Sequence, residues 1–363
     1  MANLKTFITD MMESDETRGA YAPFFFLSIL YERIMRLRNY CFEASIIKSR
    51  RLASPVISIG NITVGGTGKT PMVIMLAGLL KKEGFRPAVL SRGYGAKQKE
   101  RINIVSDGTK ILMGIQEAGD EPLLMAQSLG DVPVITGKNR YRTGRHATDN
   151  YRANILLLDD AFQHRSLKRD IDIVLLDGAL PFGNGYMLPR GMLRESKGAL
   201  KRADIVVLTG NDGDEKRSEE AVKALRKYTG APLFFASRKP DSLIDGKTGD
   251  KLPLDSLKAK RICAFSGIAQ PENFRKTLEG LGGTIVSFIP FPDHHVYTEA
   301  DIEEIGRRAV ESSAEIIITT EKDGVKLIDV PPFLHDIYLL RIEMEITPSN
   351  HEFTTLILER LKA

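Results

Sequence analysis

The sequence predicts an α/β protein with a mostly parallel sheet, a smaller second α/β domain, and an N-terminal amphipathic helix. Three observations lead to this fold class. From Pro55 onward, short β-branched runs alternate with helical segments, which is typical of parallel sheets with helical crossovers. Several of these runs are apolar at consecutive positions, as strands covered on both faces are. The first run leads directly into a glycine-rich loop and then a helical segment.

The first series of elements fills residues 51–235. Strands are expected at Val56–Ile59, Pro87–Leu90, Val132–Thr136, Asn154–Leu158, Ile171–Leu176 and Ile205–Thr209. Helices are expected at Pro71–Glu83, Glu121–Leu129, Asn139–Tyr151 and, as a charged and exposed segment, Asp212–Lys227.

A second series follows Pro240. Its elements are strands at Ile262–Ser266, Thr284–Ile289, Ile316–Thr319 and Ile337–Ile342, and helices from Pro271, from Glu299 and near Asn350. Residues 237–257 are rich in Asp, Lys, Gly and Pro and have weak periodicity, so the domain boundary is expected there or slightly before. We therefore predict a helical segment at residues 1–50, a first domain at 51–235 and a second domain at 236–363.

The composition of the 363 residues is that of a globular protein, with 42% hydrophobic and 27% charged residues. The 51 basic and 47 acidic side chains leave a net charge of +4, which does not favour a nucleic-acid partner. The two cysteines form no CxxC pair, so the sequence supports neither a disulfide framework nor a thiolate metal site. A reducing cytosol is the expected setting.

The N-terminal region predicts an amphipathic helix. Five apolar side chains recur at three- and four-residue steps, namely Leu27, Leu30, Ile34, Leu37 and Cys41. The uncharged stretch from Gly19 to Tyr31 has 13 residues, fewer than the about 20 that span a bilayer. Such a helix either packs on its own domain with its arginines solvated, or lies in the headgroup layer of an anionic membrane.

The glycine-rich loop predicts a phosphate-binding site. It runs from Gly60 to Thr70 between the first strand and the first helix, and its binding residues are Gly65, Gly66, Thr67, Gly68, Lys69 and Thr70. Glycines let backbone N–H groups converge on phosphate oxygens at a helix N-terminus. Lys69 is expected at the β- and γ-phosphates and Thr70 at Mg²⁺. The usual pattern has glycine at position 63, where this chain has threonine. A P-loop NTPase-like domain is favoured over a chance glycine-rich turn.

Two carboxylates end a later apolar strand. Asp159 and Asp160 follow Asn154–Leu158, at the sheet edge where ligands gather in such folds. Adjacent strand residues face opposite ways, so one carboxylate is expected at the metal while the other points elsewhere. Aspartate also commonly begins a helix, but the phosphate loop favours the metal role for at least one of them.

Phosphoryl transfer to a hydroxyl calls for a group that takes or orients its proton. No base-reading motif of the GTPases occurs, because Thr320–Asp323 has the wrong spacing. Asp120 and the pair His294 and His295 are candidates, although composition alone also allows a helix N-cap and surface loop residues.

Seven segments together resemble the tetraacyldisaccharide 4′-kinase family. They are 55–71, Ser91-Arg92-Gly93-Tyr94-Gly95, Gly119-Asp120-Glu121-Pro122, 158–164, 189–195, Phe291-Pro292-Asp293-His294-His295 and Thr319-Thr320-Glu321-Lys322-Asp323. The match runs in order from the N-terminal segment to about Lys326. The resemblance implies transfer of the γ-phosphoryl of ATP to the 4′-hydroxyl of a tetraacylated glucosamine disaccharide 1-phosphate in lipid A biosynthesis. It also implies a site between two α/β domains, the second of which closes over it.

The resemblance also implies roles for individual residues. Asp120 is the expected base, paired with His294 or His295 from the second domain. Asp159 and Asp160 would serve Mg²⁺ and the hydroxyl. Sugar and phosphate contacts are implied for Arg92, Gln163, His164, Arg194 and Glu195.

A lipid substrate implies work at the cytoplasmic face of the bacterial inner membrane. The tip Phe24–Phe26 and the basic residues Arg33, Arg36 and Arg38 then become an interfacial anchor. A P-loop regulatory ATPase and a soluble small-molecule kinase are the alternatives; neither would phosphorylate the lipid.

Overall fold

The computed structural model describes residues 7, 10–12, 14, 19–97, 100–210, 215–327, 337–347 and 349–362. Its strands are β1 Val56–Gly60, β2 Pro87–Ser91, β3 Asn103–Ser106, β4 Val134–Thr136, β5 Ile155–Asp159, β6 Ile171–Asp177, β7 Ile205–Thr209, β8 Leu233–Asp245, β9 Lys251–Leu252, β10 Arg261–Ser266, β11 Thr284–Pro290, β12 Ile316–Thr320 and β13 Ile337–Thr347.

Helices cover the sheet on both faces. They are α2 Ala22–Glu43, α3 Lys69–Lys82, α4 Ile115–Ala118, α5 Asp120–Leu129, α6 Arg140–Tyr151, α7 Glu215–Arg226, α8 Pro271–Gly280, α9 Glu299–Glu311, α10 Glu321–Gly324 and α11 Asn350–Lys362. Three 3₁₀ turns lie at Gly19–Tyr21, Lys197–Arg202 and Leu254–Leu257.

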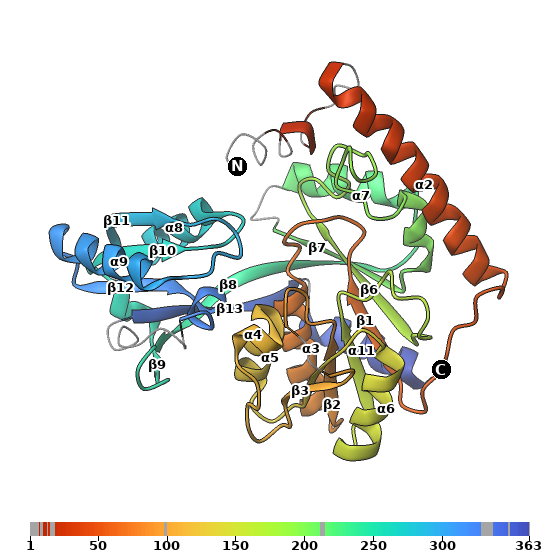
Figure 1. Cartoon of the computed structure of the whole chain (residues 1–363), viewed down its shortest axis with the longest axis horizontal. Coiled ribbons are helices and arrows are strands. Elements are labelled where there is room, and N and C mark those ends of the chain that lie inside the picture. Colours follow the sequence, from red (N-terminus) through yellow and green to blue (C-terminus); the bar gives the residue numbers. More distant parts are fainter. Residues whose placement is uncertain are drawn as a thin grey trace.

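One sheet runs through the described chain in the order β11-β10-β12-β13-β8-β7-β6-β1-β5-β2-β4-β3, with β9 paired to β8. We call the part built on β1–β7 the first lobe and the part built on β9–β12 the second lobe. Within each lobe most pairs are parallel, as predicted, while β3 runs antiparallel to β4. Figure 1 shows the two lobes side by side, joined by the long strands β8 and β13.

The strands that join the lobes differ from the sequence expectation. The boundary at residues 235/236 lies inside β8, whose start pairs with β7 and whose remainder pairs antiparallel with β13. This segment lacks alternation because its middle is polar, with Pro240 beside a register shift in the pairing with β13. Its extended form comes from the partner strand. Residues 235 and 236 are therefore neighbours within one strand, and the division into two domains at this point stays a prediction.

The C-terminal helix packs on the first lobe, although the prediction assigns residues 236–363 to the second domain. Phe353 and Ile357 of α11 are buried in the core formed by α3, α5 and one face of the first-lobe strands. Phe353 packs edge-on against Phe234 of β8, with ring centroids 5.2 Å apart. Helix α11 therefore belongs to the first lobe, although it follows the second lobe in the chain.

The first-lobe strands are buried on both faces, which explains their continuous apolar runs. In β1, Ile57 and Ile59 face the core that contains α3, whereas Val56 faces the core that contains α6. All five residues of β1, β2 and β5 are buried. This packing fixes the carboxyl ends of the central strands, from which the phosphate loop and the carboxylates project.

Candidate active site

The phosphate loop joins β1 to α3 with the backbone that such a loop needs. Gly65 and Gly68 have positive φ angles of 112° and 82°, which favour glycine. Gly68 precedes Lys69, the first residue of α3, so the helix N-terminus points at the loop. Asn61 donates to the Thr67 hydroxyl at 3.1 Å within the loop, and Thr209 of β7 donates to the Thr67 carbonyl at 3.1 Å, so the loop is braced internally and by a neighbouring strand.

Threonine at position 63 is compatible with the path of the loop. Thr63 forms a β-bridge with Leu193, and the next residue, Val64, donates to the Met192 carbonyl at 2.8 Å. Thr63 is not among the residues with positive φ, so no glycine is required there. The loop begins as a short extended segment paired with residues 192–193 and turns only at Gly65.

Lys69 lies within reach of Asp160. Its ammonium is 3.7 Å from Asp160 Oδ1, and Arg194 donates to both oxygens of the same carboxylate at 2.9 and 3.0 Å. Burial would raise the pKa of Asp160, but Lys69 and Arg194 outweigh it and the pKa is lowered. Asp160 has a φ of 45°, a strained conformation for a non-glycine residue. The structure therefore brings together three of the predicted site residues.

Asp159 is the most buried carboxylate of the site. It pairs in register with Ile59 of β1 and is 2% exposed. Ser91 donates to its Oδ2 at 3.0 Å, whereas its buried Oδ1 has no hydrogen-bond partner among the described residues. Burial, followed by the charges of Glu121 and Asp160, raises the pKa of Asp159 to about 7. A buried oxygen without a partner, crowded by other carboxylates, suits a cation.

Two neighbours of Asp159 were missed by the sequence analysis. Glu121 follows Asp120 directly, and this adjacency was the available signal. Arg140 is 3% exposed and donates to the Gly137 carbonyl at 2.6 Å and to the Asp159 carbonyl at 3.3 Å. Burial lowers the pKa of Arg140 to about 10. An arginine that begins a helix is usually a surface residue, so the sequence offered no signal for it.

Asp120 and His294 meet across the two lobes. Asp120 begins α5 in the first lobe, His294 lies in the loop after β11 in the second, and His294 Nδ1 is 2.8 Å from Asp120 Oδ2. Burial would raise the pKa of Asp120, but the hydrogen bonds with His294 and with its own backbone amide outweigh burial and bring the pKa below its usual value. The carboxylate is thus ionised at neutral pH, as a proton acceptor requires.

His295 has a different partner. Its Nε2 is 3.1 Å from Asp301 Oδ2, and its ring stacks on Phe291 with centroids 4.6 Å apart. Of the two histidines left open by the sequence, the structure therefore places His294 against Asp120 and uses His295 to hold the start of α9. The inclusion of His295 among the catalytic candidates is not supported by its position.

Arg92, Gln163 and His164 lie near one another in a basic region. Burial, then the charges of Arg140, Arg169, Arg38 and Arg92, lower the pKa of His164 to about 4, so this histidine is neutral. Gln163 donates to the Asn61 carbonyl at 2.8 Å and its own carbonyl accepts from Arg38 of α2. Excess positive charge at this place suits an anionic group.

Glu195 does not line this region. It is fully buried and accepts from Asn39 of α2 at 2.7 Å and from Arg202 at 2.9 and 3.1 Å. The expected contact between Glu195 and substrate is replaced by contacts within the protein. A second hydrogen bond also links α2 to this segment, because the Tyr31 hydroxyl donates to the Arg194 carbonyl at 3.1 Å. Glu195 therefore fastens α2 to the first lobe.

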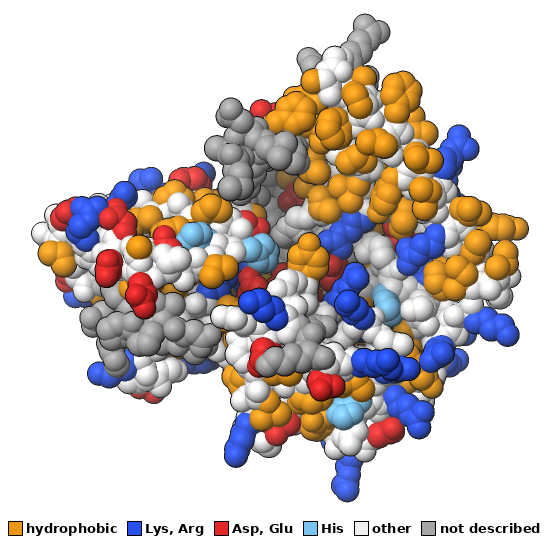
Figure 2. Space-filling model, in the orientation of Figure 1, with side chains coloured by type: hydrophobic (Ala, Val, Ile, Leu, Met, Phe, Trp, Pro, Cys, Tyr) orange, Lys and Arg blue, Asp and Glu red, His pale blue; other side chains and the backbone are white. Residues whose placement is uncertain are grey.

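The opposite face of α2 is apolar and exposed. Leu30 is 57% exposed and Leu37 is 64% exposed, and the helix exposes five more large apolar side chains: Phe26, Leu27, Ile29, Ile34 and Tyr40. Ile46 and Ile47, which follow the helix, are exposed as well. Figure 2 shows them as a continuous apolar field beside a group of basic side chains. The predicted helix face is confirmed, and it is turned to solvent. No helix of the described chain has the length and hydropathy needed to cross a membrane.

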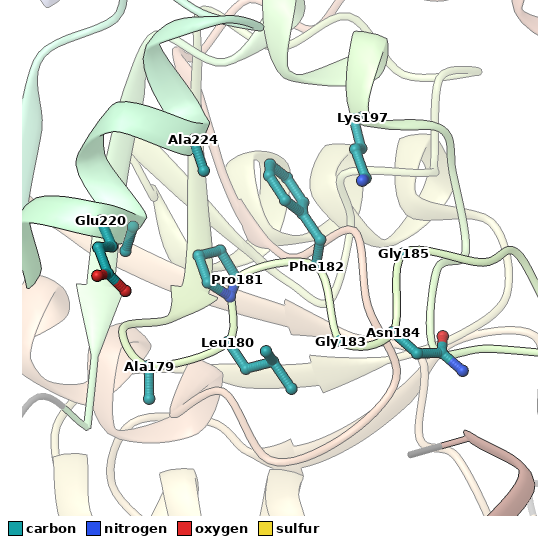
Figure 3. A pocket seen from close by; sticks show the side chains of 11 residues that line it. Ala179, Leu180, Pro181, Phe182, Gly183, Asn184, Gly185, Lys197, Glu220 and Ala224 are labelled. Carbon is teal, nitrogen blue, oxygen red and sulfur yellow. The ribbon is translucent and has the colours of Figure 1, made fainter. Parts of the chain in front are cut away.

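A cavity of about 290 Å³ lies between α7 and residues 179–185, away from these groups (Figure 3). Its lining includes Pro181, Phe182, Lys197 and Glu220 and contains none of the predicted site residues. The candidate site is therefore the phosphate loop with the carboxylates and His294 around it, which the two lobes form together.

Comparisons with known proteins show which family this chain resembles over nearly its whole length. The family model described as tetraacyldisaccharide-1-P 4'-kinase, LpxK, matches residues 21–362. The chain is 48% identical to a tetraacyldisaccharide 4'-kinase of Syntrophus aciditrophicus, covering 97% of each chain, and 42% identical to that of Pelobacter propionicus, covering 88% of this chain and 87% of the other. A crystal structure described as the "apo" form of LpxK from Aquifex aeolicus in complex with ATP has a TM-score of 0.78 and 36% identity, covering 92% of this chain and 97% of that one.

The chain belongs to the tetraacyldisaccharide-1-P 4'-kinase family. It is a phosphotransferase with an alcohol group as acceptor, and the predicted fold class and function are confirmed at the level of the family. The two alternatives, a regulatory ATPase and a soluble small-molecule kinase, are not favoured by this membership.

Proposed function

We propose that the chain transfers the γ-phosphoryl of ATP to the lipid's 4′-hydroxyl with Asp120 as the base and His294 as its partner. A bond forms between the 4′-oxygen and the γ-phosphorus, and the bond from that phosphorus to the β–γ bridging oxygen breaks. The hydroxyl proton passes to the carboxylate of Asp120, and ADP leaves with the electron pair of the broken bond. Atoms and charge balance without a further reactant.

The observation that carries this proposal is the contact of 2.8 Å between His294 and Asp120, formed by residues 174 positions apart on different lobes. A hydrogen bond from the imidazole orients the carboxylate, and its lowered pKa keeps it ionised. Glu121, the next residue, acts electrostatically on Asp159 behind the phosphate loop.

Lys69 and the loop amides hold the triphosphate in this proposal. Lys69 is 11% exposed and its known neighbour is the carboxylate of Asp160. A triphosphate would compete for the same ammonium and release Asp160, which Arg194 still holds in place. Burial of this ammonium strengthens its attraction for phosphate.

Mg²⁺ fits the donor set of the site. Asp159 supplies a buried carboxylate oxygen without a hydrogen-bond partner, and Thr70 supplies a hydroxyl at the start of α3. Oxygen donors of this kind are those that Mg²⁺ prefers. The bound ion would neutralise charge that develops on the phosphates. Asp160 is already paired with Arg194, so we assign the metal to Asp159 and Thr70. Asp160 instead lies between the charged groups of Arg194 and Lys69.

The exposed face of α2 is the proposed membrane contact, at the cytoplasmic face of the inner membrane. Its inner face is fixed to the first lobe by Tyr31 and Asn39, so the apolar face is presented rigidly. Arg33 and Arg36 are exposed on the same helix and suit anionic headgroups, whereas Arg38 is bonded to Gln163. A lipid substrate would then reach the site from the bilayer surface.

The experiment that tests the catalytic roles is a kinase assay with Mg-ATP and acylated disaccharide 1-phosphate, read by the mass of the product. Asp120→Asn should lower kcat by about 10²–10⁴-fold with little change in the KM for ATP. Asp131→Asn is the matched control, because Asp131 is an exposed aspartate two residues after the end of α5 and pairs with Lys81. An Asp120→Asn protein that turns over like the wild type would exclude this base.

A further inference from the structure

The segment Thr319–Asp323 has no role in the site described so far, yet its structure is unusually well fixed. It ends β12 and forms the short helix α10. Arg341 of β13 is bonded to Glu321 at 2.6 and 2.8 Å. Asp323 is fully buried and accepts from the Gly267 amide at 3.0 Å and from the Thr320 hydroxyl at 2.8 Å. The residues on both sides of Lys322 are therefore held by the lobe.

Two connections lead from this segment to His294. The first follows the backbone: Gly267, whose amide donates to Asp323, accepts from the His294 amide at 3.2 Å. The second runs through a side chain, because Lys322 Nζ lies 3.4 Å from His294 Nε2 and 3.2 Å from Asp293 Oδ1. His294 has a φ of 59°, so its backbone needs such support.

The second connection determines which ring nitrogen of His294 carries the proton. A lysine ammonium only donates hydrogen bonds, so a hydrogen bond across this 3.4 Å contact requires Nε2 of His294 as the acceptor. The ring proton is then on Nδ1, which donates to Asp120 Oδ2. In this state the imidazole is neutral and Asp120 keeps its full negative charge.

Lys322 supplies a positive charge beside the His294 ring, which otherwise has carboxylates on both sides. Asp120 of α5 faces Nδ1, and Asp293 of the same loop lies 3.8 Å from Nε2 through Oδ2. Lys322 of α10 stands between Asp293 and the ring, and Lys326 acts on Asp120 from the same lobe. Without the Lys322 ammonium, two carboxylates would flank the imidazole and favour its protonation. A positively charged His294 would make Asp120 a weaker base.

We propose that Lys322 is a positioning residue that keeps His294 in the neutral tautomer with its proton on Nδ1, facing Asp120. Lys322 acts through His294. This inference rests on the proposed roles of Asp120 and His294.

The test compares Lys322→Met, which keeps the length of the side chain without its charge, with Lys322→Arg, which keeps the charge. Lys260→Met is the matched control, because Lys260 lies in the same lobe and pairs with Glu315 at 2.7 Å. At saturating Mg-ATP, Lys322→Met should lower kcat/KM for the lipid at neutral pH by about tenfold, less than the ~10²–10⁴-fold that an acid–base group itself supplies, because Lys322 acts through His294. Its loss should shrink as the pH rises, so the acid limb of the profile moves to higher pH. Lys322→Arg and Lys260→Met should keep the wild-type profile.

Two further measurements separate this role from a merely structural one. In a His294→Ala background, Lys322→Met should cause little additional loss, because the residue through which it acts is gone. With ring-labelled histidine, NMR should show the Nδ1–H tautomer for His294 in the wild type and a protonated ring in Lys322→Met, with the signal assigned by His294→Gln.

The outcomes that contradict the inference are distinct from those that contradict the proposed function. A Lys322→Met profile parallel to the wild type at every pH, additive losses in the double variant, or an unchanged His294 spectrum would overturn the role of Lys322 alone. Full activity of Asp120→Asn and His294→Ala would overturn the pair itself.

Discussion

The two sides of the active site are held in different ways. On the first-lobe side, Asp159 is 2% exposed and the Lys69 side chain 11% exposed, and both project from the central strand β5 or the helix after β1. On the second-lobe side, His294 is 51% exposed and sits in a loop with a positive φ. The residues of the first side are positioned by burial within the first lobe. The position of His294 relative to them depends on the paired strands β8 and β13, which join the two lobes.

This difference indicates which side of the site is rigid and which side tolerates change. Buried charges interact strongly and are costly to leave without partners, so the phosphate side is preorganised. In the proposed mechanism, the half-exposed His294 acts through one hydrogen bond to a carboxylate of the other lobe. Substitutions on the first side should therefore have larger effects than those on the second, and the following predictions test this order.

The largest effect is expected for Lys69→Ala. Removing the ammonium leaves the triphosphate without its buried cation, and kcat/KM should fall by about 10³-fold or more. Lys82→Ala, an exposed lysine at the end of the same helix, is the control. Circular dichroism should show an intact fold. Activity within a few fold of wild type in a folded Lys69→Ala protein would reverse the ranking of the two sides.

His294→Ala should cost less, about 10²-fold in kcat, because Asp120 remains to accept the proton. His295→Ala is the natural comparison, since that ring pairs with Asp301 and stacks on Phe291. It should lower thermal stability and leave kcat close to wild type. Steady-state kinetics and thermal melts of both variants show whether His294 alone supports Asp120. Equal losses of kcat would mean that both histidines do so.

Asp159→Asn should change stability with a definite sign. The pKa of Asp159 is raised from 3.8 to about 7, so the folded protein holds this proton more tightly than the unfolded chain does. Its contribution therefore favours folding below about pH 4 and is lost as the pH rises to about 7. In the nucleotide-free wild type, the free energy of unfolding should therefore fall by on the order of 1–4 kcal/mol between about pH 5 and pH 8 because of this group. In the variant, which cannot ionise at this position, that fall should be absent.

Calorimetric melts at the two pH values, with and without Mg²⁺, check this prediction. Added Mg²⁺ should raise the Tm of the wild type at the higher pH and leave Asp159→Asn unchanged. A metal-induced rise in the variant equal to that of the wild type would show that Asp159 does not hold the ion.

The smallest effect on folding and chemistry is expected on the exposed face of α2. Leu30→Ser with Leu37→Ser should weaken binding to anionic vesicles by about tenfold or more, since two leucines no longer enter the headgroup layer. The free energy of unfolding should change by less than about 0.5 kcal/mol, because both side chains are exposed. Ile111→Ser with Leu112→Ser, two exposed apolar residues elsewhere, is the control. Unchanged co-sedimentation of the α2 variant with vesicles would remove the membrane contact.

Much of the fold followed from local pattern. The apolar runs of β1, β5 and β6 and the helices α3, α5 and α6 were predicted within a few residues, because burial on both faces of a strand and periodic burial of a helix leave a strong signal. Strands β3, β8 and β9 were missed. Their extended form comes from neighbouring strands, and the polar middle of β8 has no periodicity of its own.

The sequence by itself determined the phosphate loop, the paired aspartates after β5, Asp120 and the family, because each rests on residues adjacent in the chain. Tertiary structure alone decided that His294 pairs with Asp120, that Glu195 is an internal anchor, that Arg140 is buried behind Asp159, and that the apolar face of α2 is turned outward. The physical reason is that these depend on pairings between distant segments, and a one-dimensional pattern records the chemistry of a side chain without its partner.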